Sequence, residues 1–203
     1  MERKLSVSLS GITPLPAGHV ATIKSYLARP VPAAPETPAL PAGIALAPLG
    51  GREAARYRAL FTTLGERWLW WSRLMLAPED LAVLLDHPGI AACAVVRGGR
   101  DIGLLELDFR ELPVADLAFL GLIEGETGHG LGSALIANAL AAMARRDARQ
   151  ATVNTCTFDS PHALGFYRRH GFAVTGQAVE IVPDPRLSGL LPASAAPHVP
   201  ILA

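Results

Sequence analysis

The feature that most restricts the fold of this chain is a glycine-rich turn at residues 128–132, placed between an apolar run and a helix-forming stretch. The apolar run covers residues 117–123, and the helix-forming stretch covers residues 133–146. Glycines permit positive φ and close approach of a ligand, and the first N–H groups of a helix have no carbonyl partner within it. The order of strand, glycine turn and helix therefore predicts an α/β fold with an anion site, for which phosphate is the natural ligand.

Two common nucleotide-binding motifs do not match the spacing of these glycines. A Walker loop requires a lysine after its last glycine, whereas Leu131 follows Gly130 here. The dinucleotide fingerprint requires a third glycine three positions after the second, and that position holds Ser133. The spacing therefore argues against nucleoside triphosphate hydrolysis and against binding of NAD or FAD.

A second motif follows after one further expected strand, and the two motifs together resemble the coenzyme A-binding core of the GNAT N-acetyltransferase superfamily. The motifs are Gly128-x-Gly130-Leu131-Gly132-x-x-Leu135 and Ala163-Leu164-x-Phe166-Tyr167-x-x-x-Gly171-Phe172. Either motif alone is weak, whereas the ordered pair is fairly specific, and the resemblance extends over residues 90–181. The family usually has Arg or Gln before the first motif glycine, but this chain has Thr127. Backbone donors would therefore carry more of the phosphate contact.

The resemblance implies a single domain over residues 1–203 with the GNAT fold, in which helices flank a mixed, mostly antiparallel sheet of about six to seven strands. It also implies acetyl-coenzyme A as the acetyl donor. The residues expected to bind this donor are Leu120, Gly121, Leu122, Gly128, His129, Gly130, Leu131, Gly132, Ser133 and Asn154. For Asn154, an ordinary polar strand residue without ligand contact is the alternative.

The implied reaction is transfer of an acetyl group to a primary amine of a small molecule or a peptide, by direct attack in a ternary complex. Tyr167 matches the family tyrosine that points towards the thioester sulfur, and a phenol is a suitable proton donor for the departing thiolate. The general base stays open between Glu106, Asp108 and Asp116, and solvated strand carboxylates are the alternative for each. A non-catalytic acyl-coenzyme A-binding module on the same fold is the alternative function.

Three tryptophans and several charged residues gather at residues 66–73, where the family builds its acceptor site. Trp68 is expected to line the pocket, with Glu66 binding an amine and Arg73 binding a carboxylate. Core packing alone would also explain Trp68. Nothing in this cluster distinguishes an amino acid, aminoglycoside, polyamine or peptide as the acceptor.

The remaining elements follow from hydrophobic periodicity and turn residues. Further strands are expected at residues 19–28, 90–96, 102–109, 151–158 and 172–182. Helices are expected at residues 52–76 with an interruption near Gly65, at 78–85, and over about ten residues that begin after Ser160 as N-cap and end before Gly171. A proline-rich connector at residues 30–48 is not expected to form regular structure, and residues 183–203 are expected to be a tail or a lid.

Composition argues against several other classes of function. With 18 basic and 18 acidic residues the net charge is zero, which gives no electrostatic footprint for nucleic acid or an anionic membrane and is compatible with a homodimer. The six histidines are dispersed, so no metal site is expected. The two cysteines imply no disulfide framework, and the lack of a long apolar span predicts a cytoplasmic protein.

Overall fold

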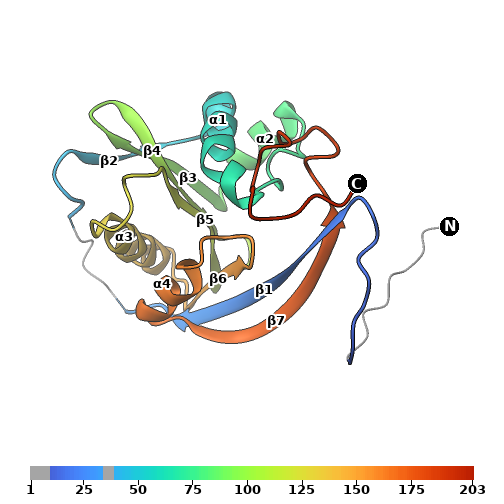
Figure 1. Cartoon of the computed structure of the whole chain (residues 1–203). Helices are drawn as coiled ribbons and strands as arrows, with labels where there is room; N and C mark the ends of the chain where they lie inside the picture. Colours follow the sequence, from blue (N-terminus) through green and yellow to red (C-terminus); the bar gives the residue numbers. More distant parts are fainter. Residues whose placement is uncertain (1–9, 34–38) are drawn as a thin grey trace.

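A computed structural model describes residues 10–33 and 39–203, which build one sheet of seven strands in the order β2-β3-β4-β5-β6-β1-β7 (Figure 1). Neighbouring strands are antiparallel except β5 and β6, which are parallel. The strands are β1 (His19–Pro30), β2 (Ile44–Pro48), β3 (Ile90–Arg97), β4 (Arg100–Asp108), β5 (Val114–Leu122), β6 (Gln150–Cys156) and β7 (Ala173–Pro183). The predicted fold class, a mostly antiparallel sheet flanked by helices, is confirmed.

Helices cover both faces of this sheet (Figure 1). They are α1 (Ala54–Gly65), α2 (Pro78–Leu85), α3 (Leu131–Arg145) and α4 (Ala163–Arg169), with short 3-10 turns η1 (Gly51–Glu53) and η2 (Glu66–Trp68). Helices α1 and α2 pack on one face through side chains such as Tyr57 and Leu81, and α3 and α4 pack on the other through Met143 and Tyr167. Among the helices of the described residues, none is long and apolar enough to cross a membrane.

Helix α3 begins directly after the glycine turn, as the sequence predicts. Gly130 precedes its first residue with a φ of 82°, a conformation that glycine adopts without strain. Leu131, Leu135 and Ala139 are buried, and their spacing of four residues places them on one face of the helix. This face anchors α3 to the sheet, while its N-terminus stays at the glycine turn.

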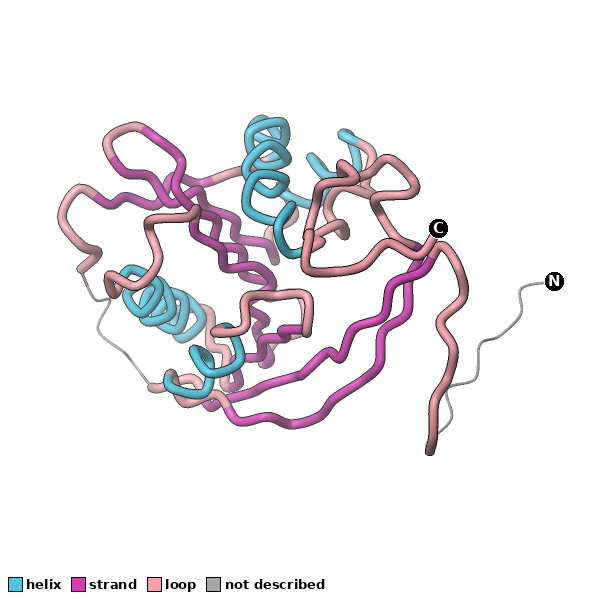
Figure 2. Tube along the Cα trace, viewed as in Figure 1, coloured by secondary structure: helices cyan, strands magenta, loops and turns pink. Residues whose placement is uncertain are grey.

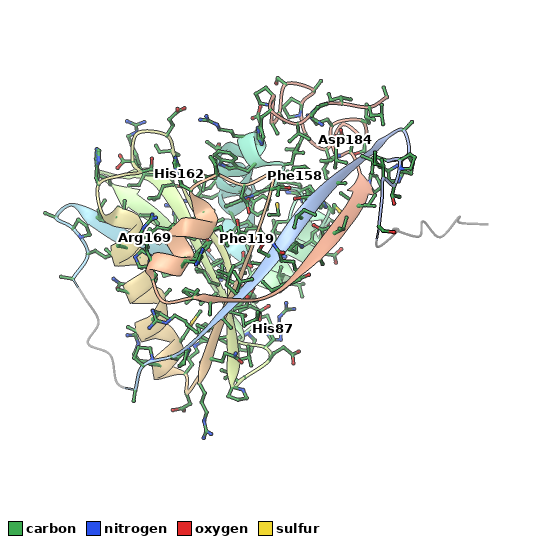
Figure 3. All side chains as sticks on the ribbon, turned by 60° about the horizontal axis from the view of Figure 1, so that its bottom comes forward. His87, Phe119, Phe158, His162, Arg169 and Asp184 are labelled. Atoms are coloured by element: carbon green, nitrogen blue, oxygen red, sulfur yellow. The ribbon has the colours of Figure 1, made fainter. Side chains whose placement is uncertain are left out.

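The first strand of the chain lies between the last two strands of the sheet. β1 pairs antiparallel with β6 over residues 24–30 and with β7 over residues 19–28. Figure 3 shows β1 and β7 running together as a long ribbon, at one end of which Asp184 lies. The N-terminal strand therefore completes the C-terminal half of the sheet. The strand over residues 19–28 was predicted, but its position between β6 and β7 was not.

Two predictions in the N-terminal half are wrong. Within the supposedly irregular connector, residues 44–48 form β2, which pairs with β3 at the edge of the sheet. Proline is tolerated at an edge, where its missing N–H leaves no ladder bond unmade. The helix expected over residues 52–76 is α-helical only to Gly65. After one 3-10 turn the chain reverses at Leu69, whose φ of 53° is left-handed.

The short helix before β7 also begins later than predicted. The sequence suggested Ser160 as the N-cap, whereas the structure has His162 as the N-cap and Ala163 as the first helical residue. The main-chain N–H of Ala163 donates to the carbonyl oxygen of Ser160 at 2.9 Å, which makes a turn ahead of the helix. The predicted glycine end is confirmed, since Gly171 follows the helix with a φ of 82°.

Residues 184–203 contain no helix or strand, yet they pack beside α1 and η2 (Figure 2). Leu191 and Ala196 belong to the core beneath α1 and α2. The buried Arg186 pairs with Asp184 at 2.7 Å and donates to the carbonyl oxygen of Val199 at 2.8 Å. The segment that was expected to be a tail or a lid is therefore a packed part of the core.

Candidate active site

The two parallel strands at the centre of the sheet separate after a short paired stretch. β5 and β6 are in register only over residues 114–116 and 150–152, so the last matched pair is Asp116 and Thr152. Beyond this pair, β5 stays bonded to β4, with a bulge at Ala118 between the pairs Leu107–Leu117 and Glu106–Phe119. The opposite edge of β5 therefore faces an opening with main-chain groups that no strand of the described residues pairs.

This opening is where an extended ligand can add to the sheet through main-chain hydrogen bonds. Leu120, Gly121 and Leu122 lie on the free part of β5 and are half-buried. Asn154 lies across the opening on β6, where it is exposed and opposite Tyr26 of β1. The structure thus places the four predicted pantetheine-binding residues on the two sides of one opening.

The glycine turn follows the end of β5 that β6 does not pair, and it precedes α3. Gly128 and Gly130 have φ values of 85° and 82°, and a Cβ on either would meet nothing within 4 Å. Gly132 is different, because a Cβ there would lie 3.2 Å from the Phe166 ring of α4. The turn therefore presents uncovered main chain beside the first N–H groups of α3, and His129 and Ser133 are exposed there. These residues fit a pyrophosphate group, which needs backbone donors and open space.

Tyr167 is buried, with 8% of its surface exposed, and its ring packs against Phe166 and Phe172 with centroids 5.4 and 5.9 Å apart. Burial raises the pKa of Tyr167, and the negative charges of Asp159 and Asp116 raise it further. The phenol therefore keeps its proton at neutral pH. Within residues 10–33 and 39–203, no hydrogen bond occupies its hydroxyl group.

Asp116 lies at the point where β5 and β6 separate. Its carboxylate accepts a hydrogen bond of 2.6 Å from the Thr152 hydroxyl group. Burial raises the pKa of Asp116, the Thr152 hydrogen bond opposes this, and the nearby charges of Asp108 and Glu106 raise the pKa again. A carboxylate with a raised pKa is a stronger base than an exposed one, which suits removal of a proton from an ammonium group.

Glu106, the other predicted base, lies in a buried cluster. Its side chain has no exposed surface, and it accepts a hydrogen bond of 2.5 Å from Arg73 and another from the Tyr57 hydroxyl group. Arg73 also lies over the Phe119 ring, with its guanidinium carbon 5.1 Å from the ring centroid. The alternative of a solvated carboxylate therefore does not describe Glu106. Both of its oxygens are engaged, so the geometry favours Asp116 as the base.

The predicted acceptor residues do not converge on one pocket. Arg73 joins the Glu106 cluster, whereas Trp68 stacks edge-on against His198 of the C-terminal segment, with centroids 5.9 Å apart. The main-chain carbonyl of Glu66 accepts a hydrogen bond of 3.1 Å from Ala196. The assignment of Glu66 and Trp68 to substrate binding stays a prediction, and their surroundings are those of a docking site for residues 184–203.

Trp70 lies beside the opening, and the sequence alone assigned it no individual role. Its indole N–H donates to Asp159 at 3.1 Å, and its ring lies 5.2 Å from that of Phe119. A Cβ on Gly121 would lie 3.0 Å from the same indole ring. Trp70 thus spans from β5 to the end of β6. The signals were present, since Trp70 belongs to the tryptophan cluster and Asp159 follows a predicted strand, but only the fold brings them together.

Comparison with known proteins agrees with this geometry. The model of the acetyltransferase (GNAT) family matches residues 55–172, more than half of the chain. The chain belongs to this family. Its GNAT region spans every element from α1 to α4, including the opening and the glycine turn. A search of the curated proteins finds no match.

Solved structures show the same fold at low sequence identity. A Staphylococcus epidermidis protein described as functionally unknown aligns with a TM-score of 0.63 at 14% identity, over 82% of this chain and 63% of its own. A GCN5-related N-acetyltransferase from Sphaerobacter thermophilus aligns with a TM-score of 0.56 at 19% identity, and the alignment covers 81% of this chain and 53% of the other. An aminoglycoside acetyltransferase from an uncultured soil metagenomic sample, in complex with sisomicin, aligns with a TM-score of 0.53 at 15% identity. This alignment covers 63% of this chain and 86% of the other.

These comparisons support acetyl transfer in general. The family generally uses acetyl-coenzyme A, and the residues around the opening fit this donor for the reasons given above. The chain spans less than two thirds of the length of the first two of these structures.

Proposed function

We propose that this protein is an N-acetyltransferase that moves an acetyl group from acetyl-coenzyme A to a primary amine by direct attack. The observation that carries the proposal is the separation of β5 from β6 after Asp116, with the glycine turn at one end and Tyr167 close by. The main chain of Leu120 to Leu122 and the Asn154 side chain would hold the pantetheine arm. Residues 128–133 would hold the pyrophosphate through backbone donors.

Acetyl-coenzyme A supplies the thioester whose carbonyl carbon the amine attacks. Asp116 receives a proton from the amine nitrogen, which leaves that nitrogen free to form the new C–N bond as the C–S bond breaks. Tyr167, which holds its proton at neutral pH, donates to the departing sulfur. An ammonium nitrogen loses two protons when it becomes an amide: Asp116 takes the first before attack, and the second, lost as the C–S bond breaks, replaces the proton that Tyr167 gives to sulfur. Asp116 then passes its proton to solvent, so each turnover releases one proton and needs no further reactant.

The buried Glu106 cluster supports this site without touching the reacting atoms. Glu106 and Phe119 are paired across β4 and β5, and Arg73 contacts both. The cluster therefore holds the segment of β5 that follows the Ala118 bulge. We infer a positioning role for Glu106, Arg73 and Tyr57.

The proposal is tested by thiol release from acetyl-coenzyme A with a panel of primary amines. Tyr167→Phe and Asp116→Asn should each lower kcat by about 10²–10⁴-fold, the usual contribution of an acid or base, with little change in the Kd for acetyl-coenzyme A. Asp147→Asn is the matched control, because Asp147 is exposed after α3 and its φ of 59° suits Asn. The control should keep wild-type kcat.

Two results would contradict the proposal. Tight binding of acetyl-coenzyme A without turnover of any amine would favour the non-catalytic module. Unchanged kcat in Tyr167→Phe, with chemistry shown to be rate-limiting, would remove the acid assignment. The cytoplasmic location and a homodimer stay predictions, to be checked by fractionation and by sedimentation.

A further inference from the structure

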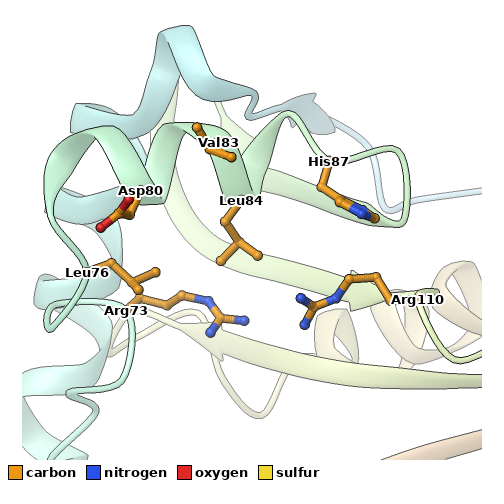
Figure 4. A pocket seen from close by; sticks show the side chains of 7 residues that line it. All are labelled: Arg73, Leu76, Asp80, Val83, Leu84, His87 and Arg110. Atoms are coloured by element: carbon orange, nitrogen blue, oxygen red, sulfur yellow. The ribbon is translucent and has the colours of Figure 1, made fainter.

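A pocket opens on the α2 side of the sheet, and none of its lining residues belongs to the glycine turn. It has a volume of about 440 Å³ and lies between α2, the loop that carries Arg73, and the turn after β4 that carries Arg110 (Figure 4). The guanidinium groups of these two arginines point towards each other across the pocket, and His87 lies beside Arg110. Leu76 and Leu84 supply apolar walls.

Neither arginine has its donors fully used. Arg73 donates from Nη2 to Glu106, and its Nε is the only buried side-chain nitrogen or oxygen of the described residues that has no hydrogen-bond partner. Arg110 donates from Nε and Nη2 to Asp108, and 45% of its side chain is exposed. A guanidinium group has five N–H donors, so both can bind a further acceptor. The Arg73 Nε is shielded from the pocket, so the donors available to a ligand are the remaining N–H groups at the ends of the two guanidinium groups.

The two positive groups are close enough to repel each other. Asp108 raises the pKa of Arg110 overall, but the charge of Arg73 acts in the opposite direction on it. A carboxylate between two guanidinium groups removes this repulsion, and its planar shape matches their paired donors. Glu106 and Asp108 already balance the two arginines, and Asp80 adds a negative charge at the rim. A ligand with no net charge therefore fits better than a multiply charged anion.

The pocket adjoins the proposed base through the register of the sheet. Asp108, the partner of Arg110, is paired with Asp116 across β4 and β5. Paired residues point to the same face of a sheet, with Cβ atoms about 4.5–5.5 Å apart. A molecule of a few atoms in length can thus reach from the arginines to Asp116.

We propose that the acetyl acceptor is a small amino acid, bound with its carboxylate between Arg73 and Arg110 and its amine at Asp116. The inference rests on the proposed function, which by itself names only a primary amine. The apolar walls at Leu76 and Leu84 receive the side chain of the amino acid. Specificity for the acceptor lies in the arginine pair, since an amine without an acid group brings no carboxylate to the two guanidinium groups that line the pocket.

The test compares L-amino acids with their carboxamides, which keep the amine and side chain but lose the negative charge. Binding is measured by calorimetry in the presence of coenzyme A, and turnover is measured separately. At least one amino acid should bind about tenfold more tightly than its amide. Arg110→Gln should weaken that binding about tenfold and change the Kd of the amide and of acetyl-coenzyme A by less than about twofold, where tenfold equals about 1.4 kcal/mol.

Arg56→Gln is the control, because Arg56 also forms a paired, partly exposed contact with a carboxylate, that of Asp101, away from the pocket. This variant should leave binding of the amino acid unchanged. The inference is overturned if no amino acid binds more tightly than its amide, or if Arg110→Gln weakens both equally. Acetylation of amides as good as that of acids would remove the inference and leave the proposed function. If an amino acid bound in an Arg110-dependent way but was not acetylated, the carboxylate site would stand and the proposed function would be contradicted.

Discussion

Replacing Glu106 by Gln should destabilise this protein strongly, because it leaves a buried guanidinium group without its counter-charge. Glu106 has no exposed side-chain surface, and 17% of its partner Arg73 is exposed. A glutamine has one oxygen where the carboxylate has two, and both Arg73 and Tyr57 donate to the carboxylate. In the variant, the amide oxygen can accept from Arg73 and the NH2 group can donate to the Tyr57 hydroxyl oxygen, which also accepts, so what the variant loses is the negative charge beside Arg73.

The size of the effect follows from burial. Removing one partner of a buried ion pair costs about 3–5 kcal/mol. The partial exposure of Arg73, and the hydrogen bonds that Gln can keep, place the expected loss near the lower end, at about 3 kcal/mol. For a chain of this size each kcal/mol lowers Tm by about 2–4 °C, so the expected shift is about 6–12 °C.

Asp101→Asn supplies the matched comparison. The Arg56–Asp101 pair has the same 2.5 Å contact as the Arg73–Glu106 pair, but 41% and 25% of its two side chains are exposed. Solvent screening limits such a pair to about 0.2–1 kcal/mol, or a Tm shift below about 4 °C. Urea unfolding followed by circular dichroism measures both variants. If Glu106→Gln destabilised the protein no more than Asp101→Asn, the argument from burial would be refuted.

Three further predictions concern the opening. Because burial raises the pKa of Asp116 in the folded state, this group makes the free energy of unfolding fall as pH rises from its unfolded pKa through the folded one. Asp101, Asp108 and Asp184 have lowered pKa values and act in the opposite direction, so the test is the difference in unfolding free energy between wild type and Asp116→Asn. That difference should fall across this pH range, and a constant difference in urea titrations would contradict the prediction. Gly130→Ala should lower the free energy of unfolding by about 1–2 kcal/mol, because alanine is strained at the φ of 82° while its Cβ would meet no other atom. Calorimetry measures the change in Tm, and a Tm within about 1 °C of wild type would disprove the strain. Thr127→Arg should lower the Kd for acetyl-coenzyme A by adding a charged donor beside the glycine turn, and calorimetry showing equal Kd would mean that backbone donors suffice.

Much of the fold could be predicted because its signals are local. Helix α2 has the predicted bounds, and β3 and β4 form at the strands predicted over residues 90–96 and 102–109, joined by a turn at Gly98 and Gly99. The glycine turn and α3 follow from backbone freedom and four-residue spacing, which depend only on near neighbours in the chain. The donor-binding residues were named from the family resemblance, whose motifs lie in or next to these elements, and their role stays a prediction.

The acceptor side could not be predicted, because its contacts join residues that are far apart in the sequence. Trp70 binds Asp159, and Glu106 binds both Tyr57 and Arg73. A charged residue in an apolar strand has no preferred partner until the sheet and helices close around it.

The sequence by itself determined the strand, glycine turn and helix and the resemblance to one family, and from these it predicted an anion site. The tertiary structure alone decided that β1 lies between β6 and β7, that β5 separates from β6 at Asp116, and that Arg73 and Arg110 face one pocket. The physical reason is range. Backbone conformation is set by neighbouring residues, whereas ion pairs, strand neighbours and pockets arise only when packing brings distant residues together.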